Sequence, residues 1–534
     1  MENRIDMLKL FHKHFKINSN DKLKSLNDLD NDSNIFASNV SDMKDKKIAI
    51  YLNDFYSFLV AFFGILKSNK QCIILHKMTS GSDILLIDSD NINNFLDVRT
   101  SVTKQYALDI DSVFYLQTSG SSGESKNIAK TIRQMLREAE FLNTFLGVDH
   151  KHYFMSSVTH NHMYGMSFKV FLPLICGGEV LGQEMPFVEL IFSAVVSQKS
   201  VLITSPTLLN SLSQYPHNDV LNKIQIVSAG AKLDESVWQR LKDANILEIY
   251  GSTECGVMCY KQDHTAFLRR FDPVKLSLNN DCLVIESPWC EKFYSNDLAS
   301  IEGDNVTLCG RADRIVKIAD KRVNIDSIES VLNTFDLISS SRLDLLDNAT
   351  HLSGIITLSD SGIELFKRMG KKEIVSRIST FLKPHFGGIL RYIYIRDTLP
   401  INAQGKITKD AFKESIKAKH MPMFNVDYLD ESSLRASGKV PISCFYFDWH
   451  FSDFPIVPGF IEIGFIVNLA RHLNINVENI IEIIHAKWIR FICPLDVLEI
   501  HLELKNDRLN FEILANNTLS ASGKIHIHKA EQNV

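Results

Sequence analysis

The sequence predicts an α/β protein with a parallel sheet, followed by smaller α+β units. Short apolar runs alternate with helical patterns in the first third of the chain, as expected for strands joined by crossover helices. A loop rich in serine and glycine interrupts this alternation at residues 118–123. Near the end of the chain, one apolar helix precedes several β-prone runs, which predicts a separate folding unit.

Length and charge narrow the functional classes. A chain of 534 residues is too long for one core and predicts two to four domains. The 58 basic and 63 acidic residues give a net charge of −5, too balanced to indicate a nucleic acid or a membrane surface as partner. Cys255 and Cys259 lack the second pair that a zinc site needs. Without an apolar signal core or a run that spans a bilayer, we expect a cytoplasmic protein with no membrane insertion.

The first elements follow from periodicity and capping. Residues 1–17 have the pattern of an amphipathic helix, and the polar stretch that follows to residue 34 reads as a loop. Asp54 is placed to cap a helix at 54–67. This helix is expected to lie among short strands at 48–51, 72–75 and 84–87.

The serine- and glycine-rich loop is the first candidate site. It follows the apolar run 113–116 and comprises, with the lysine behind it, Thr118, Ser119, Gly120, Ser121, Ser122, Gly123 and Lys126. Small residues let a tight loop aim its N–H groups at an anion, while hydroxyls and a lysine add donors. The loop is not a Walker A motif, because Ser125 and Asn127 flank the lysine. It indicates nucleotide phosphates as ligand; the alternative is an ordinary surface turn.

A helix is expected at 130–147, followed by a strand and turn that carry two histidines. His160 has the character of a surface residue satisfied by water. His162 is closely followed by Gly165 and an apolar helix at 166–176, an arrangement that favours the wall of a pocket.

A second candidate site lies where further predicted strands end. Strands at 201–204 and 224–228 lead to Gly230 and Ala231, and a later strand begins at Ile246. This later strand ends in Tyr250, Gly251, Ser252, Thr253 and Glu254. Open α/β sheets bind ligands at the carboxyl ends of their strands. Glu254 is therefore a candidate ligand for Mg²⁺ and Thr253 a candidate phosphate donor, with a capped helix start as the alternative.

Residues 264–309 read as a β-rich region that includes Asp297. The charged and glycine-containing segment around Arg311 and Asp313 has the character of a hinge. A smaller α/β unit follows and contains Lys406 on a turn, where the alternative is an ordinary surface lysine.

Taken in order, these segments resemble the core motifs of the adenylate-forming superfamily, which includes acyl-CoA synthetases and aryl-acid ligases. The resemblance covers roughly residues 40–415. It implies ATP and Mg²⁺ as cofactors, with residues 118–126 holding phosphate and Glu254 holding the metal. It also implies that Lys406 contacts the α-phosphate and the carboxylate of the substrate.

Further roles follow from the same resemblance. His162 and Gly165 would line the acyl pocket, Gly230 and Ala231 the adenine site, and Tyr250 would stack on adenine. Asp297 would bind ribose with Arg311 as its partner, Asp313 would be the hinge, and Arg322 lies in the loop that follows. The glycine expected two residues before Arg322 is Asp320 here. A phosphopantetheine thiol, on a carrier protein or on CoA, is the expected acyl acceptor.

The tail has its own motif. Residues 416–438 read as a linker, and the strip from His450 to Gly459 precedes an apolar helix and β-rich runs. This strip resembles that of β-hydroxyacyl carrier-protein dehydratases of the hotdog fold. The resemblance implies His450 as general base and the N–H of Gly459 as donor to the thioester carbonyl. The acid of that family, five residues after the glycine, is Gly464 here, and Glu462 is the nearest carboxyl.

The sequence therefore predicts a large adenylate-forming domain (1–309), a small mobile α+β domain (310–415), a linker (416–438) and an α+β hotdog domain (439–534). We expect a ligase for a fatty or aryl acid, an acyl carrier protein as partner, and a homodimer formed through the hotdog domain. The alternatives are a hotdog domain that is a thioesterase or a non-catalytic docking and dimerisation module. A scaffold without catalysis is the remaining class.

Overall fold

A computed structural model shows how these segments fold. It describes residues 3–19, 22–76, 84–96, 105–119, 125–195, 199–216, 218–318, 321–346, 349–401, 407–448, 453–475, 478 and 480–528. The chain divides into two compact units, which are considered separately. The first unit comprises Met1–Ala312 with Ile401–Lys409, and the second comprises Asp313–Pro400 with Asp410–Val534.

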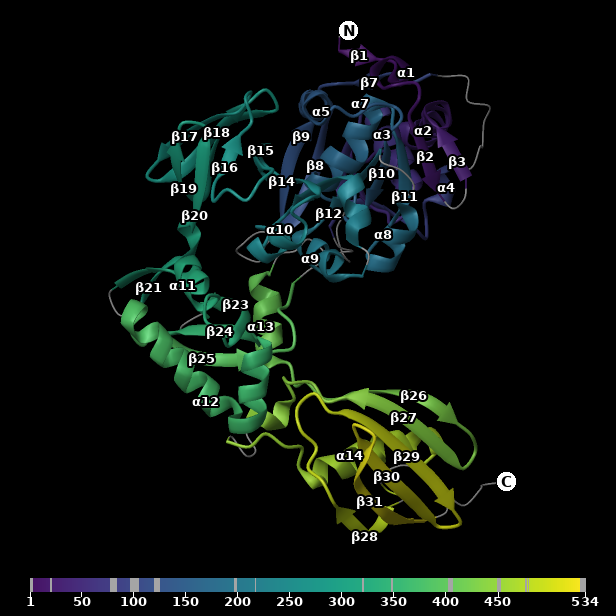
Figure 1. Ribbon diagram of the computed structural model, residues 1–534. Coiled ribbons are helices and arrows are strands. Elements are labelled where there is room, and N and C mark those ends of the chain that lie inside the picture. The colour runs from purple at the N-terminus through teal and green to yellow at the C-terminus, as the bar shows by residue number, and fades with distance from the viewer. Residues whose placement is uncertain are drawn as a thin grey trace. The chain divides into compact units, whose positions relative to one another are not determined.

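The first unit contains a five-stranded sheet in the order β6-β4-β5-β8-β9. Its strands are β4 (Lys47–Tyr51), β5 (Gln71–Ile74), β6 (Leu85–Asp88), β8 (Val113–Ser119) and β9 (Ser125–Thr131). The first four pair in parallel. Strand β9 turns back antiparallel to β8, and these two strands are labelled in Figure 1. The expected parallel sheet is therefore confirmed.

Helix α3 (Phe55–Lys67) connects β4 to β5 and is buried along its whole length except for partly exposed residues in its first turn. Asp54 caps the helix as predicted, accepting a hydrogen bond from Ser57 N. Phe58, Phe62 and Phe63 are fully buried in the main core. Each buried phenylalanine contributes about 1.5–3 kcal/mol relative to an exposed one.

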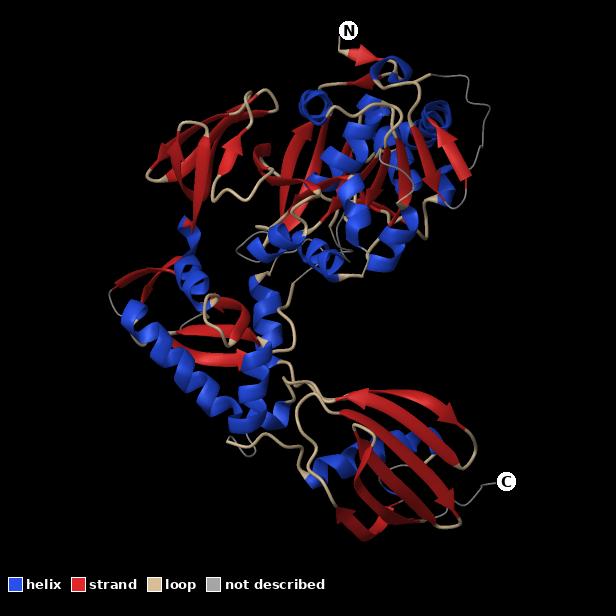
Figure 2. Cartoon of the chain, in the orientation of Figure 1, coloured by secondary structure: helices blue, strands red, loops and turns tan. Residues whose placement is uncertain are grey.

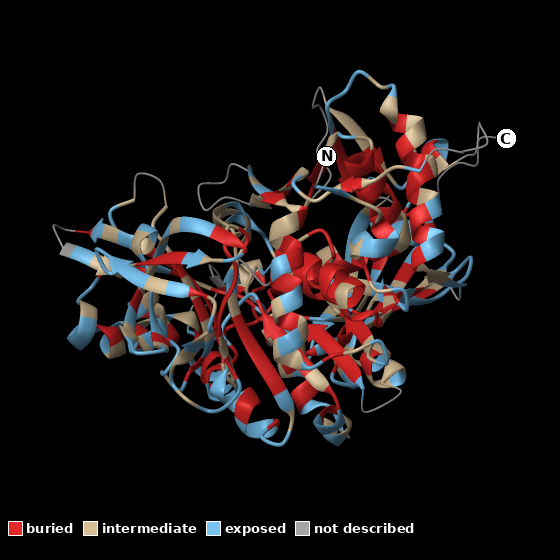
Figure 3. Ribbon diagram, turned by 90° about the horizontal axis from the view of Figure 1, so that it is seen from above, coloured by how far each residue is buried: buried red, intermediate tan, exposed pale blue. Residues whose placement is uncertain are grey.

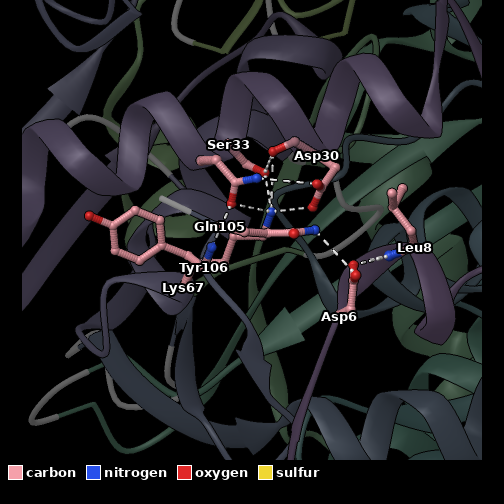
Figure 4. A network of polar contacts seen from close by, with 8 residues as sticks. Asp6, Leu8, Asp30, Ser33, Lys67, Gln105 and Tyr106 are labelled. Atoms are coloured by element: carbon pink, nitrogen blue, oxygen red, sulfur yellow. Dashed lines mark hydrogen bonds and ion pairs between the residues drawn. The ribbon is translucent and has the colours of Figure 1, made fainter. Parts of the chain in front are cut away.

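Helix α2 (Leu26–Ser41) occupies most of the stretch expected to be a loop, and the expected helix at 1–17 is reduced to α1 (Met7–Leu10). A capping box between Ser25 and Asp28 starts α2. Its polar residues are satisfied inside the protein: Lys67 Nζ donates to Asp30 Oδ1 at 2.6 Å and to Ser33 Oγ at 2.8 Å (Figure 4). This buried lysine joins α3 to α2, so the polar character of the sequence reflects an internal network.

The larger sheet of the first unit has thirteen strands, and its parallel part carries the predicted alternation. Strands β10 (Tyr153–Ser156), β12 (Ser200–Thr204), β13 (Gln225–Ala229) and β14 (Asn245–Ser252) are parallel neighbours. Helix α5 (Ile132–Leu146) matches the helix expected at 130–147 to within a few residues, and α9 (Pro206–Gln214) and α10 (Glu235–Arg240) follow β12 and β13. Figure 2 shows helices on either side of these strands.

The β-rich region expected at 264–309 is also confirmed. After β15 (Gly256–Lys261), the chain forms antiparallel strands that extend the same sheet. They are β16 (Leu268–Arg270), β17 (Lys275–Asn279), β18 (Cys282–Ser287), β19 (Cys290–Glu302) and β20 (Asn305–Arg311).

The second unit begins with a small α+β domain. Its three-stranded sheet has the order β23 (Ile338–Asp344), β24 (Leu352–Leu358) and β25 (Leu390–Ile395). Helices α11 (Ile325–Leu332) and α12 (Asp360–Phe386) pack on these strands, and α13 (Lys409–Lys417) follows. A break at Gly370, where φ is 72°, divides α12 into two helices.

The rest of the second unit is an antiparallel sheet in the order β26-β27-β29-β30-β31-β28 with helix α14 (Gly459–Ala470) against it (Figure 2). Its strands are β26 (Met423–Leu429), β27 (Ser433–Lys439), β28 (Ile480–Trp488), β29 (Val497–Lys505), β30 (Arg508–Ala515) and β31 (Thr518–Ile527). One helix covered by such a sheet is the expected hotdog fold, called the hotdog domain below.

Residues 416–438 do not form the expected linker, since they contain β26 and most of β27. Strand β27 pairs with β29 along seven residues, and its Leu434 and Ala436 are buried in the hotdog core. Strand β26 is an edge strand with mostly exposed side chains, which explains why its sequence looks unstructured. Figure 3 shows the buried residues concentrated on the inner helices and strands.

Candidate functional site

The β8–β9 hairpin carries the predicted phosphate loop. Thr118 on β8 and Lys126 on β9 are paired across the hairpin, and Thr118 Oγ1 donates to the carbonyl of Lys126 at 3.4 Å. The side chain of Lys126 is exposed. Ser119 ends β8, and Gly120, Ser121, Ser122 and Gly123 lie outside the described residues.

The end of β14 lies close to this hairpin. Lys130 Nζ on β9 donates to the carbonyl oxygen of Glu254 at 2.5 Å, although β9 and β14 belong to different sheets. Thr253 is buried, and Ser252 Oγ accepts a hydrogen bond from Cys255 N at 3.1 Å. Gly251 faces the chain across the turn, where an added Cβ would lie 2.6 Å from the carbonyl oxygen of Gly256.

A buried acid supports the same turn. Glu138 on α5 accepts a hydrogen bond from Val257 N at 2.8 Å and one from Ser167 Oγ at 3.3 Å. Burial raises the pKa of Glu138 to about 6, and the nearby Lys130 opposes this shift. At Gly256, where φ is 73°, a Cβ would come within 2.7 Å of the Glu138 carboxylate. Lys130 and Glu138 therefore fix the backbone on both sides of Cys255.

Tyr250, Asp297 and Arg311 form one polar chain. The Tyr250 hydroxyl donates to Asp297 Oδ2 at 2.5 Å, and Arg311 Nη1 donates to Asp297 Oδ1 at 3.1 Å. Asp297 and Arg311 are also direct partners in the β19–β20 ladder. Burial and the adjacent Asp297 raise the pKa of Tyr250. Hydrogen bonds thus hold the three side chains together, while their predicted roles toward ATP stay predictions.

The residues expected around the acyl and adenine pockets occupy ordered turns. His162 caps α6 (Met163–Gly165), and Gly165 is so close to the preceding turn that a Cβ would lie 2.1 Å from the Thr159 carbonyl oxygen. Gly230 follows β13 with φ of 103°, and Gly230 and Ala231 are exposed.

The surface position expected for His160 is wrong. It is fully buried, and its Nε2 lies 2.8 Å from the carbonyl oxygen of Leu52. Burial lowers the pKa of His160 to about 3, so the ring is neutral at physiological pH.

The second unit contains the predicted hinge residue and Arg322. Asp313 lies in the short turn at its beginning, and Arg322 is an exposed residue of β22 (Lys321–Asn324), paired with Lys317 of β21 (Ile315–Ile318). Asp320 and Lys406 lie outside the described residues. Their predicted roles stay predictions.

In the hotdog domain, Gly459 is the first residue of α14, and Pro458 before it provides no side-chain cap. A Cβ on Gly459 would lie 2.6 Å from Nε1 of Trp488, so the indole packs directly on the helix start. Glu462 lies in the first turn and is buried. His450 lies outside the described residues.

The side chains at the end of β14 and on β19 fit ATP with Mg²⁺. Tyr250 offers an aromatic ring, Asp297 an acid for sugar hydroxyls, and Glu254 a carboxylate. No group of three or more metal-ligating side chains gathers in the part of the chain that the structure describes. A single protein carboxylate is sufficient when nucleotide phosphates and water provide the other Mg²⁺ ligands.

The sequence interpretation missed two contributors, Lys130 and Glu138, and noted Glu462 only as the nearest carboxyl. Glu138 had a detectable signal, because it lies in the apolar stripe of α5 together with Met135 and Leu142. Lys130 had no such signal in the sequence, since its partner is 124 residues away.

Among the described helices, none is long and apolar enough to cross a membrane.

Comparisons with known proteins divide the chain into the same ligase-like part and hotdog domain. Residues 68–276 match the family model of AMP-binding enzymes, and residues 427–524 match that of ApeI dehydratases. ATP-bound MatB from Rhodopseudomonas palustris is similar in fold, with a TM-score of 0.65, 14% identity, and coverage of 77% of this chain and 98% of that chain.

Two further solved structures share the fold. A benzoate CoA ligase from Burkholderia xenovorans LB400 has a TM-score of 0.61 at 18% identity, covering 75% of this chain and 96% of that chain. The o-succinylbenzoate CoA synthetase of Bacillus subtilis, solved with ATP and magnesium ion, has a TM-score of 0.61 at 15% identity and covers 77% and 97%. The chain thus carries an AMP-binding enzyme domain within an acyl-CoA ligase fold and, after it, an ApeI-like dehydratase domain of the hotdog fold.

Proposed function

We propose that this chain uses ATP to activate a fatty or aryl carboxylic acid as an acyl-adenylate and passes the acyl group to a phosphopantetheine thiol. The observation that carries the proposal is the hydrogen bond from Lys130 to the Glu254 carbonyl. It links the strand after the predicted phosphate loop to the strand end that bears Glu254, the proposed Mg²⁺ ligand. The proposed phosphate and metal sites are therefore neighbours.

The chemistry requires charge neutralisation. A substrate carboxylate oxygen attacks the α-phosphorus, the bond to the bridging oxygen breaks, and pyrophosphate leaves. Attacking and leaving groups are both anionic, so a metal and positioned cations lower the barrier by several kcal/mol. Glu254 would hold Mg²⁺, while Lys126, at the phosphate loop, and Lys406 would supply the cations. The chain formed by Tyr250, Asp297 and Arg311 would orient the nucleoside.

Acid-dependent exchange of pyrophosphate into ATP tests the ligase. We expect exchange with a fatty or aryl acid and Mg²⁺, a loss of at least about 10²-fold in Lys126→Ala, and full activity in the exposed-lysine control Lys242→Ala. Absence of exchange across a panel of aromatic and medium-chain acids would refute the ligase. Supplying CoA or a carrier protein then distinguishes the thiol acceptor.

For the hotdog domain, we propose dehydration of 3-hydroxyacyl thioesters with His450 as general base. The match of residues 427–524 to ApeI dehydratases and the indole-covered helix start at Gly459 support this reaction. A 3-hydroxyacyl carrier substrate should give the 2-enoyl product. Release of free acid would instead indicate a thioesterase, and an unchanged substrate a non-catalytic module.

We also propose that two copies associate through the hotdog domain. Exposed apolar residues gather at the start of α14 and after β28, with Phe460 64%, Ile489 61% and Phe491 60% exposed. Such a patch on a sheet edge favours association. A solution mass of twice 60.7 kDa is expected, and a monomer at assay concentration would contradict the proposal.

A further inference from the structure

The hotdog domain contains a carboxyl group in an unusual position. Glu462 lies on the face of α14 that also bears Ile466 and Leu469, and only 2% of its surface is exposed. The Trp488 side chain lies beside its carboxyl group. Among the described residues, no group hydrogen-bonds to its second oxygen, Oε2. A hydrogen-bonding atom is therefore buried without a partner next to the start of the helix.

Glu462 is the only buried acid of the described hotdog residues that is available for chemistry. The other one, Asp496, accepts hydrogen bonds from Cys493 N at 2.9 Å and Asn516 Nδ2 at 2.8 Å, and Arg490 lies 3.8 Å away. Both oxygens of Asp496 are therefore engaged in hydrogen bonds, with a guanidinium group nearby. Glu462 has no such cation and only the indole as donor.

The surroundings of Glu462 favour the protonated form of its carboxyl group. Burial raises the pKa of Glu462 to about 7, and the hydrogen bond from Trp488 partly opposes this shift. The strand residues that face α14 are apolar, whereas the titratable side chains of the same strands are not buried. The buried ones are Leu434 and Ala436 of β27 and Leu498, Ile500 and Leu502 of β29; the titratable ones are Arg435, Lys439, Glu499, His501, Glu503 and Lys505, together with Glu482, His485 and Lys487 of β28.

The position of Glu462 relative to the helix start suits a thioester substrate. Trp488 contacts both the backbone at Gly459, where a carbonyl oxygen would be bound, and the Glu462 carboxyl. Half of Trp488 is exposed, whereas Glu462 beneath it is buried. At Gly464, by contrast, an added Cβ would meet nothing within 4 Å, and there is no carboxyl.

We propose that Glu462 is the acid that protonates the departing hydroxyl group of a 3-hydroxyacyl thioester. This inference rests on the proposed dehydratase function. The general base of that function takes the proton from C2, the electron pair forms the C2–C3 double bond, and the C3–O bond breaks. The proton of Glu462 joins the departing oxygen to give water. The carboxylate then recovers the proton from the base, directly or through solvent.

The experiment compares the full-length wild type with Glu462→Gln on a 3-hydroxyacyl carrier substrate. We expect kcat to fall by at least about 10²-fold, the usual contribution of a general acid. The wild-type kcat should decrease as pH rises through about 7, because the acid must be protonated, and this alkaline limb should be absent in Glu462→Gln. The exposed residue Glu512 provides the matched control, so Glu512→Gln should retain both rate and pH profile.

A second variant keeps the carboxyl group. Trp488→Phe removes the donor that favours the ionised form, so the alkaline limb should move to higher pH. If the wild type dehydrates the substrate but both variants keep its rate and pH profile, Glu462 is not the acid and the inference is overturned. If the wild type forms no enoyl product at all, the proposed dehydratase function fails instead.

Discussion

At the scale of single residues, Lys130 illustrates how the proposed ligase site is held together. Its ammonium group is buried and donates to the Glu254 carbonyl, while the Glu138 carboxylate supports the next stretch of backbone through Val257 N. Neither side chain needs to touch the nucleotide to matter. They fix where the Glu254 side chain begins, and hence where a metal ion would be held.

Replacing Lys130 by methionine should therefore loosen the turn without removing a ligand. A hydrogen bond from a charged donor is worth about 1.5–3 kcal/mol, which corresponds to a loss of roughly tenfold or more in kcat/KM. We expect this loss in pyrophosphate exchange for Lys130→Met, together with a higher requirement for Mg²⁺. The exposed-lysine variant Lys151→Met should behave as wild type, and an unchanged Mg²⁺ titration of Lys130→Met would contradict the positioning role.

At the scale of secondary-structure elements, α14 contains a glycine that costs stability. Gly464 lies inside the helix, where glycine is about 1 kcal/mol less favourable than alanine. A Cβ at this position would meet no other atom within 4 Å. Gly464→Ala should therefore raise the free energy of unfolding of the hotdog domain by about 0.5–1 kcal/mol.

Denaturant unfolding followed by tryptophan fluorescence would measure this change. A neutral or destabilising effect would show that the space beside Gly464 is filled in solution, for example by a second copy. Gly438 is the contrasting position, because a Cβ there would lie 2.5 Å from the Met423 carbonyl oxygen. Gly438→Ala should destabilise the sheet in the same assay.

Helices and strands with a clear pattern of apolar residues could be predicted from the sequence, whereas helix α2 could not. Helix α3 and strands β12 to β14 have continuous apolar runs, so their type and order followed from the pattern. Helix α2 has polar residues on its buried face because Asp30 and Ser33 bind the buried Lys67. That network depends on a residue 37 positions away, which no local pattern reveals.

The residues of the candidate site also divide into those that the sequence could predict and those that it could not. Tyr250, Asp297 and Arg311 were found through motifs, and the structure brings them into one hydrogen-bonded chain. Lys130 was missed because its importance comes from burial and from a distant partner, and the burial of Glu462 could not be read from the sequence. Strand β26 was missed because an edge strand with an exposed face resembles a linker.

At the scale of the whole molecule, the small α+β domain and the hotdog domain share one hydrophobic core within the second unit. Asp397, just after β25, accepts hydrogen bonds from Ile442 N at 2.9 Å and Ser443 N at 3.1 Å, and Ser443 Oγ also donates to it. Arg396 next to it donates to the carbonyl oxygens of Ser415 and Ile416. The junction is therefore a packed, hydrogen-bonded interface.

Asp397→Ala should weaken this junction more than either domain. Several hydrogen bonds to one carboxylate are lost, so we expect a destabilisation of about 2–4 kcal/mol. Calorimetry of the full chain should then show the hotdog domain unfolding separately from the small domain. Asp427→Ala on the exposed edge strand is the control, and an unaltered calorimetric profile of Asp397→Ala would contradict the coupling.

This junction determines where the chain can be cut. A stop codon placed after α13 would remove Ser443 and the apolar side chains of the tail, and the Asp397 carboxylate and its surrounding core would then face water. A ligase half excised there should be poorly behaved in expression trials. Domain exchange with a relative should instead place the crossover before Asp313 and transfer both small domains together.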